Sequence, residues 1–221
     1  MIVHHPDPEV LLDYAAGALA EGPSIAVATH LSLCALCRAE VARFEAMGGA
    51  LVSDAADPEA AAAAPDALLE ATLARLDEPA PRAPATAALD EATRRLVPSP
   101  LWPYLDAPPD ELAWKRVGRG VREARVAVPG ERRRVSLLRI RAGAAVPVHT
   151  HVGDELTVVL SGGFSDHAGH YGRGDFVALN EVHEHRPVAD AGEDCLCLTV
   201  VDAPARLTGP FGRLLNPLIK R

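Results

Sequence analysis

The sequence predicts an α+β protein with two domains, a small all-α domain followed by an all-β barrel or sandwich. Three observations lead to this fold class. Apolar residues recur at helical spacing through residues 1–79, proline and alanine crowd residues 80–100, and short β-like runs separated by glycines occupy residues 101–221. A change from helical to strand period across a proline-rich segment is typical of a domain boundary. We therefore expect a helical domain, a linker and a β domain within these bounds.

Proline and glycine mark the ends of the first helices. Asp7-Pro8 fits an N-cap followed by a proline in the first helical turn. Gly22-Pro23 is expected to break the chain before the second helix begins. The first three helices are expected over residues 8–20, about 24–36 and about 37–50.

A fourth helix is expected to begin at Pro65-Asp66. Leu69, Leu73 and Leu76 follow on one stripe of this helix. Such a stripe usually belongs to the core of its own domain. A small helical domain can bury only a limited area, however, so we also interpret the stripe as a surface that faces a partner.

The proline-rich segment and the β domain complete the organisation. The segment is expected to be a semi-stiff linker with residual helix near Ala88–Leu96. Runs such as Val135–Ile140 and Leu156–Leu160 are expected as strands because β-branched and leucine residues fill them between glycines. Many short strands with turn signals at this spacing favour a sandwich or a barrel.

The most specific pattern of the first domain is His30-x3-Cys34-x2-Cys37. Residues three and four apart share a helix face, so these side chains can direct one imidazole and two thiols at a single point. Zinc prefers these ligands, and a closed structural site needs a fourth. His5, or its neighbour His4, is the best candidate. The alternative is two buried cysteines that pack as small hydrophobic residues beside an ordinary histidine.

A second set of candidate ligands lies in the β domain. The segment Gly143-x5-His149-x-His151-x3-Glu155-x6-Gly162 resembles the first cupin motif at every defined position. Alternate residues of a strand share a face, so both histidines can enter a barrel, and the glutamate can follow from the continuing strand. The alternative is a cupin barrel (jelly roll) whose histidines line an empty pocket.

The second cupin motif is less complete. Gly174 and His185 stand at the expected separation, whereas three other positions depart from the pattern. These departures affect the turn more than the metal, because the ligand histidine is present. The expected site contains three histidines and one carboxylate, which suits zinc or another divalent transition metal. Its four ligands are His149, His151, Glu155 and His185.

Composition limits the compartment and the chemistry. The N-terminus lacks a secretory signal, and four cysteines without such a signal favour metal or redox chemistry over a disulfide framework. Cys195-x-Cys197 places two thiols on one strand face, where they are either core thiols or a redox pair. No run of about 18 uncharged apolar residues occurs, so we expect no membrane span and a cytoplasmic protein.

Charge is distributed unevenly along the chain. Residues 1–79 hold 3 basic and 13 acidic residues, a net of −10, whereas the whole chain has a net charge of −8. This acidic half disfavours direct binding of nucleic acid and suits a basic protein partner, with simple solubility as the alternative. The arginines between Lys115 and Arg141 are expected on solvated strand faces.

On these two motifs the sequence resembles the ChrR-type anti-sigma factors, which join a zinc-binding anti-sigma domain to a cupin. The resemblance covers nearly the whole chain apart from the linker. It implies that residues 1–79 hold an extracytoplasmic-function sigma factor, with a structural zinc at His5, His30, Cys34 and Cys37. It also implies that the cupin receives an oxidative signal, singlet oxygen or an organic hydroperoxide, and that no residue is catalytic. A metal-dependent cupin dioxygenase or isomerase with a helical docking domain is the alternative.

Overall fold

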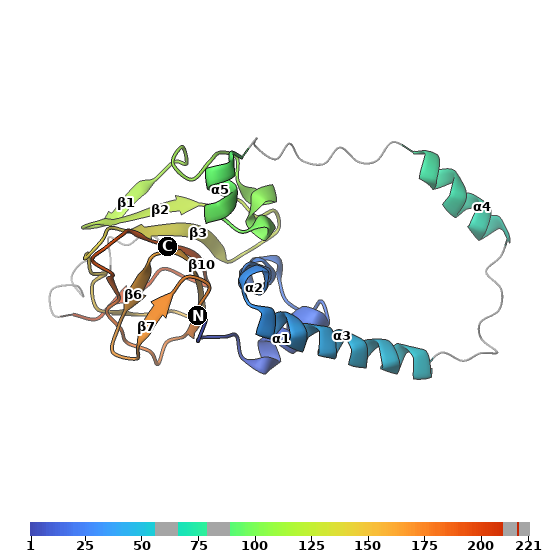
Figure 1. Ribbon diagram of the computed structural model, residues 1–221, viewed down its shortest axis with the longest axis horizontal. Coiled ribbons are helices and arrows are strands. Elements are labelled where there is room, and N and C mark those ends of the chain that lie inside the picture. Colours follow the sequence, from blue (N-terminus) through green and yellow to red (C-terminus); the bar gives the residue numbers. More distant parts are fainter. Residues whose placement is uncertain (56–65, 79–88, 210–215, 217–221) are drawn as a thin grey trace.

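The computed structural model describes residues 1–55, 66–78, 89–209 and 216. Residues 80–88 of the expected linker and the alanine-rich stretch before Asp66 therefore lie outside the described residues. A β domain occupies one side of the molecule, and a long helix extends away from it (Figure 1). The α-helices are α1 (Pro8–Ala15), α2 (Glu21–Leu33), α3 (Ala35–Ala55), α4 (Asp66–Ala74) and α5 (Glu91–Leu96). Two 3-10 helices are η1 (Arg75–Asp77) and η2 (Ser99–Tyr104).

The helix ends differ from the expected ones at glycine and proline. α1 stops at Ala15 rather than near residue 20, because Gly17 adopts a left-handed φ of 68° that ends the helical path. α2 starts at Glu21, so Gly22 and Pro23 lie inside its first turn instead of breaking the chain. A proline is tolerated there because the first N–H groups of a helix have no partner within the helix.

The β domain consists of antiparallel strands in three sheets. The large sheet has six strands in the order β1-β2-β3-β10-β5-β8, and the small ones have the orders β7-β6-β9 and β11-β4. The strands are β1 (Lys115–Gly118), β2 (Val121–Arg125), β3 (Arg134–Ile140), β4 (His149–Thr150), β5 (Glu155–Ser161), β6 (Gly163–Ser165), β7 (His170–Gly172), β8 (Phe176–Leu179), β9 (Val188–Ala189), β10 (Cys195–Val201) and β11 (Arg206–Leu207). The α+β prediction, helices followed by a cupin-like β domain, is confirmed.

The large sheet buries side chains on both faces. Its inner face packs against the smaller sheets through a cluster that includes Val159, Phe164 and Tyr171. Its outer face packs against helices, and this second cluster joins Ile25 and Val27 of α2 to Leu198 of β10. The helical region therefore lies directly on the β domain.

This packing corrects the expectation that the two halves are joined only by a tether. Within the described residues, α2 contacts β5, β10 and η2. Leu89 and Val97, which the sequence assigned to the linker, are buried, and the residual helix expected there is α5. At the start of α2, the backbone N–H of Gly22 donates to Glu131 Oε2 over 2.6 Å, and Tyr104 donates to Glu21.

Two helices leave this body. The second half of α3 projects from the molecule, and α4 lies apart from the other described elements (Figure 1). No single helix among the described residues is long and apolar enough to cross a membrane. α2 and α3 meet that test only as a pair, and the pair is bent by 120°.

Candidate metal centres and partner surface

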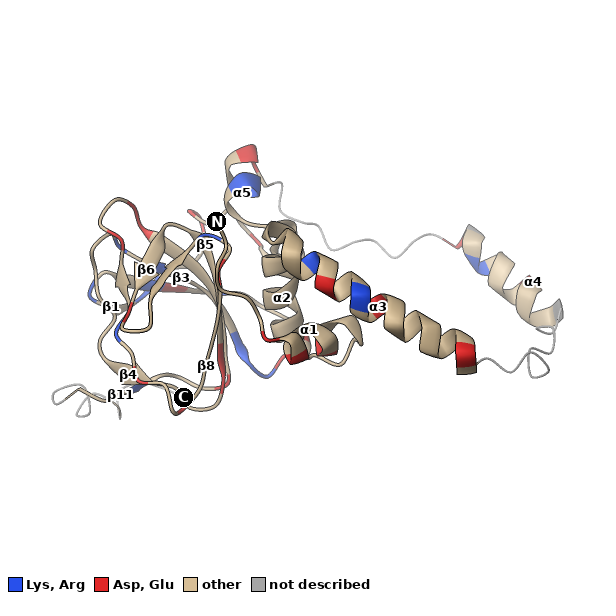
Figure 2. Cartoon of the chain, turned by 60° about the horizontal axis from the view of Figure 1, so that its bottom comes forward, with Lys and Arg blue, Asp and Glu red and all other residues tan. Residues whose placement is uncertain are grey.

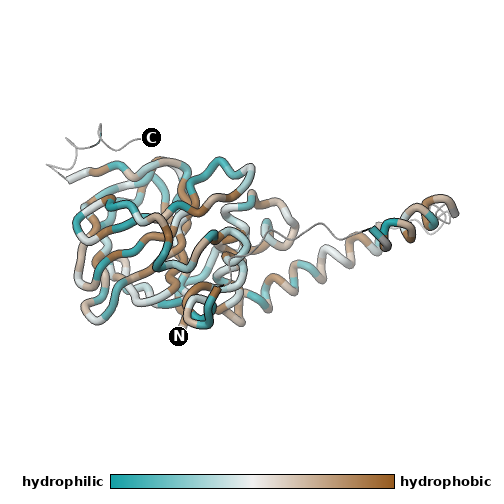
Figure 3. Tube along the Cα trace, turned by 90° about the horizontal axis from the view of Figure 1, so that it is seen from above, coloured by the Kyte–Doolittle hydropathy of each residue, from teal (hydrophilic) through white to brown (hydrophobic). Residues whose placement is uncertain are grey.

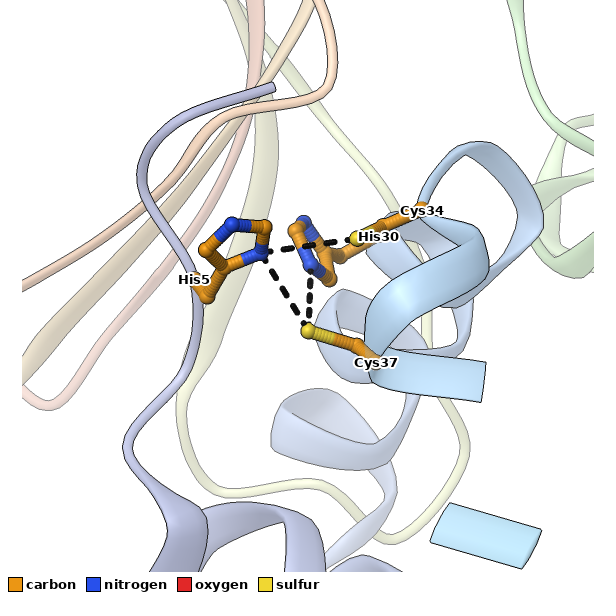
Figure 4. Close-up of side chains that lie close together, drawn as sticks. All are labelled: His5, His30, Cys34 and Cys37. Atoms are coloured by element: carbon orange, nitrogen blue, oxygen red, sulfur yellow. Dashed lines mark hydrogen bonds between the residues drawn. The ribbon is translucent and has the colours of Figure 1, made fainter. Parts of the chain in front are cut away.

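Four side chains of the N-terminal region converge on one point (Figure 4). His30 Nε2 lies 3.2 Å from Cys37 Sγ, and His5 Nδ1 lies 3.4 Å from Cys34 Sγ and 3.3 Å from Cys37 Sγ. All four ligand atoms lie within 4.8 Å of one another, so the group can hold a metal ion. The structure thus brings together the four residues expected from the sequence.

His30, Cys34 and Cys37 do not share one helix, although the spacing argument had assumed that they do. His30 lies in the last turn of α2, Cys34 is the residue after this helix with an extended backbone, and Cys37 lies in the first turn of α3. The bend between the two helices turns both thiols toward His30. His5 comes from the segment before α1, and it is the exposed member of a group whose other three side chains are buried.

The β domain orients this cluster. His30 Nδ1 donates to the backbone carbonyl of Gly174 over 2.7 Å, which leaves the Nε2 lone pair directed at the thiols. Gly174 adopts a φ of 92°, and a Cβ there would lie 2.5 Å from Ile2 Cδ1. This turn therefore requires glycine both for its backbone and for the approach of the N-terminal segment.

Asp175, the next residue, holds the N-terminal segment that carries His5. One oxygen of its carboxylate accepts from the backbone N–H groups of Val3 and His4 over 2.8 and 3.0 Å. Phe176 N–H in turn donates to the His4 carbonyl. The His4 ring points elsewhere, because its Nε2 donates to the His170 carbonyl. The sequence left open whether His4 or His5 joins the cluster; in the structure the His5 side chain lies in the cluster and the His4 side chain does not.

The electrostatics of this cluster suit a cation. Burial, together with the neighbouring Cys34, raises the pKa of the Cys37 thiol to about 12. Burial likewise lowers the pKa of His30, against the opposing effect of the Gly174 carbonyl. The protein alone therefore keeps the thiol protonated, whereas a bound divalent cation would favour the thiolate. Two sulfur and two nitrogen donors around one point fit a tetrahedral ion.

A second cluster lies in the barrel and consists of three buried histidines. His185 Nε2 lies 3.1 Å from His149 Nε2 and 3.2 Å from His151 Nε2. The three ligand atoms lie within 4.8 Å of one another, so this group can also hold a metal ion. β4 supplies the first of the three, and an isolated bridge between His149 and His185 places the third opposite it.

Each histidine of this cluster is fixed by an acceptor behind its other nitrogen. His149 Nδ1 donates to the Pro147 carbonyl over 2.8 Å. His151 Nδ1 donates to Glu155 Oε2 over 3.0 Å, and His185 Nδ1 donates to Asp166 Oδ2 over 2.9 Å. These bonds select the tautomer whose Nε2 lone pair points into the cluster, an arrangement typical of metal-binding histidines. They also keep the three rings from turning.

Glu155 differs from the expectation that it would be a fourth ligand. In the structure its carboxylate does not join the converging group and instead orients His151. Burial opposes ionisation of Glu155, but the bond from His151 and the histidine charges hold its pKa below the usual value. Asp166, whose side chain is 3% exposed, plays the corresponding role for His185 and was not predicted from the sequence. It lies between β6 and β7, where no motif spacing marks it.

The electrostatics of the barrel cluster keep the imidazoles of His149 and His185 neutral. Burial lowers the pKa of His149 to about 4, and it also lowers the pKa of His185. For Asp166, burial raises the pKa, but the bond from His185, the bond from the Ala168 N–H and the nearby histidine charges together hold the carboxyl pKa below its usual range. Neutral imidazoles beside ionised carboxylates form a donor set that fits a divalent transition metal.

The two remaining cysteines lie on the inner sheet face. Cys195 and Cys197 are both buried, and their sulfur atoms lie 3.5 Å apart. A hydrogen bond with Cys195, together with burial, raises the pKa of Cys197 well above its ordinary value. The thiolate is the reactive form of cysteine, so Cys197 is a poor nucleophile at neutral pH, and the burial of both residues fits the interpretation as core thiols.

Apolar side chains project into solvent from α3 and α4. Leu69 and Leu73 of α4 are 54% and 48% exposed, and Leu76 in η1 is 75% exposed. On α3, Met47, Leu51 and Val52 are exposed as well. Figure 3 shows hydrophobic positions recurring along both projecting helices. Within the described residues this stripe packs against no core, which favours the partner-facing interpretation. We call these six residues the apolar stripe.

Comparisons with known proteins give a consistent picture. Residues 107–203 match the family model of the ChrR cupin-like domain. The chain is 40% identical over 220 residues to the anti-sigma-E factor ChrR of Cereibacter sphaeroides, and the match covers 99% of both chains. It is also similar to a chain in the crystal structure of Rhodobacter sphaeroides SigE in complex with the anti-sigma ChrR, with a TM-score of 0.76 and 39% identity. That match covers 91% of this chain and 100% of the other.

Proposed function

This chain belongs to the ChrR family of anti-sigma factors, and from that membership we propose that it sequesters an extracytoplasmic-function sigma factor and releases it on an oxidative signal. Members of this family are regulators, so the cupin enzyme alternative is set aside. The signal, singlet oxygen or an organic hydroperoxide, acts on the barrel. A cytoplasmic location follows from the proposal, because the sigma factor acts there with RNA polymerase.

The apolar stripe carries the proposal. An exposed row of large apolar side chains on helices is the usual form of a helix that docks into a partner's groove. Residues 1–79 add a net charge of −10. A sigma factor needs basic surfaces to bind promoter phosphates, so an acidic helical region complements it and competes with DNA. The helical region therefore has both the apolar and the charged features needed to bind a sigma factor in place of DNA or polymerase.

For the N-terminal cluster we propose a structural zinc ion held by His5, His30, Cys34 and Cys37. The support is the donor set, because two thiolates and two imidazoles in a closed group favour zinc. When bound, the ion would fasten the segment before α1 to the junction of α2 and α3. Metal binding of this kind adds directly to the folding free energy of a small helical region.

For the barrel we propose zinc or another divalent transition metal bound by His149, His151 and His185. Glu155 then orients His151 rather than serving as the fourth ligand, on the evidence of its bond to the far ring nitrogen. The bound metal would act as a positive centre that fixes the three rings. Glu155 and Asp166 would restrict the rings to the same geometry in its absence.

We further propose that residues 1–79 inhibit and residues 101–221 sense, with the linker between them. The two parts communicate through the loop between β6 and β7. Asp166 at one end of this loop orients His185 of the barrel cluster. At its other end the His170 carbonyl accepts from His4, beside His5 of the N-terminal cluster. A displacement at the barrel cluster is thereby passed to the N-terminal segment without passing through the linker.

A paired-leucine substitution tests the inhibitory role. Leu69→Asp combined with Leu73→Asp places two charges in the proposed interface, and we expect at least about tenfold weaker inhibition of sigma-dependent transcription. Glu70→Gln, on the same exposed helix, is the matched control. The assay is transcription by a reconstituted polymerase with the co-purified sigma factor. Unchanged inhibition by the double variant would place the interface elsewhere.

A further inference from the structure

The outer face of the large sheet carries a hollow on its β1–β2 side. α2 covers the β5–β10 part of the sheet, whereas the hollow, of about 520 Å³, opens beside β1 and β2. Figure 2 shows basic segments around the strand labelled β1. Five arginines line the hollow, namely Arg116, Arg119, Arg122, Arg139 and Arg141. From the sequence, these side chains were expected on solvated strand faces.

The strand register aligns three of these arginines. Arg116 of β1 lies directly opposite Arg122 of β2, and Arg122 lies directly opposite Arg139 of β3. Like charges at directly opposite positions of neighbouring strands destabilise a sheet. A row of three across three strands is therefore a cost to folding, and it indicates a role for the side chains other than stability.

The arginines that line this hollow differ from others of the sheet in whether a carboxylate pairs with them. Outside the hollow, Arg125 and Arg134 pair with Glu123, and Arg133 pairs with Asp202. Inside it, the structure pairs Arg139 with the exposed Asp110. Within the described part of the chain, no carboxylate lies within ion-pair distance of the other four, which are Arg116, Arg119, Arg122 and Arg141.

We propose that this hollow is a binding site for a small ligand that carries two or more phosphate groups. Asp194 is the acidic residue among those that line the hollow, and its Oδ1 accepts from the Ala142 N–H. Counting Asp110 as well, five arginines face two carboxylates, a surplus of three positive charges. Two phosphate groups carry about three to four negative charges, and guanidinium groups bind phosphate oxygens in pairs.

The size of the hollow favours a small molecule over a polynucleotide. Small-ligand pockets measure roughly 300–1,000 Å³, and the hollow falls within that range. A nucleic acid requires a wide basic surface, whereas this chain has a net charge of −8 and an acidic first half. The residues that line the hollow include no member of either metal cluster, and the proposal does not depend on the anti-sigma function.

Calorimetric titration of the full-length protein at fixed ionic strength tests the site. The probes are inorganic pyrophosphate, inorganic tripolyphosphate and ATP. Sodium sulfate is the control anion, because it has one anionic group instead of two or more. We expect saturable binding of the polyphosphates that is at least about tenfold weaker in Arg122→Gln, because a charged hydrogen-bonding group is removed. Arg125→Gln, on the same strand but outside the hollow, should change the dissociation constant by less than about twofold.

Three controls make the outcome decisive. The metal content is measured before and after titration, because polyphosphates chelate zinc. Thermal unfolding of Arg122→Gln should be no lower than that of wild type, since the substitution relieves a like-charge contact. Tighter binding of ATP than of tripolyphosphate would assign the ligand to nucleotides, and equal binding would assign it to the phosphates alone.

The proposal is overturned by any of four results. The first is no saturable binding of either inorganic probe. The second is equal weakening in Arg122→Gln and Arg125→Gln, which would indicate diffuse attraction. The third is binding that persists in Arg122→Gln while metal is lost, which would place the probe at a metal cluster. An oligonucleotide that binds and that pyrophosphate does not displace would equally count against a small-ligand site.

Discussion

Glu131 of the β domain provides the N-terminal cap of a helix more than a hundred residues earlier in the chain. The residue before α2 is Ala20, which has no side-chain acceptor. Glu131 Oε2 accepts from the Gly22 N–H over 2.6 Å, and its other oxygen accepts from Arg132 and Arg133 N–H groups over 2.8 Å. We therefore predict that Glu131→Ala destabilises α2 and its attachment to the sheet.

The magnitude follows from the lost cap. Removal of an N-cap acceptor costs roughly 0.5–2 kcal/mol, and the partly exposed site lets water replace part of the bond, so we expect a loss of about 1–2 kcal/mol. For a chain of this size the midpoint of thermal unfolding then falls by about 2–8 °C. Circular dichroism at 222 nm during heating measures the change. Glu181→Ala, at an exposed loop position, is the matched control.

A second substitution separates capping from any other role of Glu131. Ala20→Asp places a carboxylate at the N-cap of α2. An N-cap side chain bonds the second or third N–H of its helix, and the third residue is Pro23, so Gly22 N–H is the available donor. The Glu131→Ala, Ala20→Asp double variant should therefore regain most of the lost stability. The capping role of Glu131 is refuted if the double variant is no more stable than Glu131→Ala. It is also refuted if Glu131→Ala and the Glu181→Ala control unfold at the same temperature.

Three further outcomes are expected. Burial opposes ionisation of Glu131, but its N–H donors and Arg133 lower its pKa, so its contribution is present above pH about 4.3 and is lost as the pH falls through the lower folded value. The difference in stability between wild type and Glu131→Ala should thus be smaller at pH 3 than at pH 7 in urea titrations. Cys34→Ala should remove one metal ion per chain and much of the helical dichroism, whereas intact helicity in metal-free protein would contradict a structural ion. Asp166→Asn should weaken metal binding to the barrel about 10–100-fold by competition with a chelator, and an unchanged affinity would mean that His185 needs no orienting carboxylate.

The local motifs could be predicted from the sequence because their geometry is set within a few residues. His149 and His151 enter the barrel as the alternation of a strand requires. The first cluster was predicted on a partly wrong argument, since the chain bends at Cys34, and His30 and Cys37 lie in different helices. Glu155 was placed correctly beside the cluster, but its carboxylate turns to the far side of His151. Spacing alone does not specify which atom of a side chain faces a site.

The contacts between the two halves could not be predicted, because they join residues far apart in the chain. Asp166 and Glu131 occupy loops without a motif, and their roles depend on the fold of the barrel. One signal was available. α2 is apolar on nearly all sides, with Ile25, Ala26 and Val27 buried in succession, and such a helix needs neighbours on more than one face. The expected tether would have left one of these faces in water.

The contact between His30 and Gly174 has a consequence for the order in which the protein is assembled. These residues are 144 positions apart, so at about 5–20 residues per second the ribosome adds Gly174 about 7–30 s after His30. Throughout that interval the nascent helices lack the carbonyl that orients His30, and the first residues of the chain lack the Asp175 carboxylate. The segment that is synthesised first is therefore among the last to reach its final position.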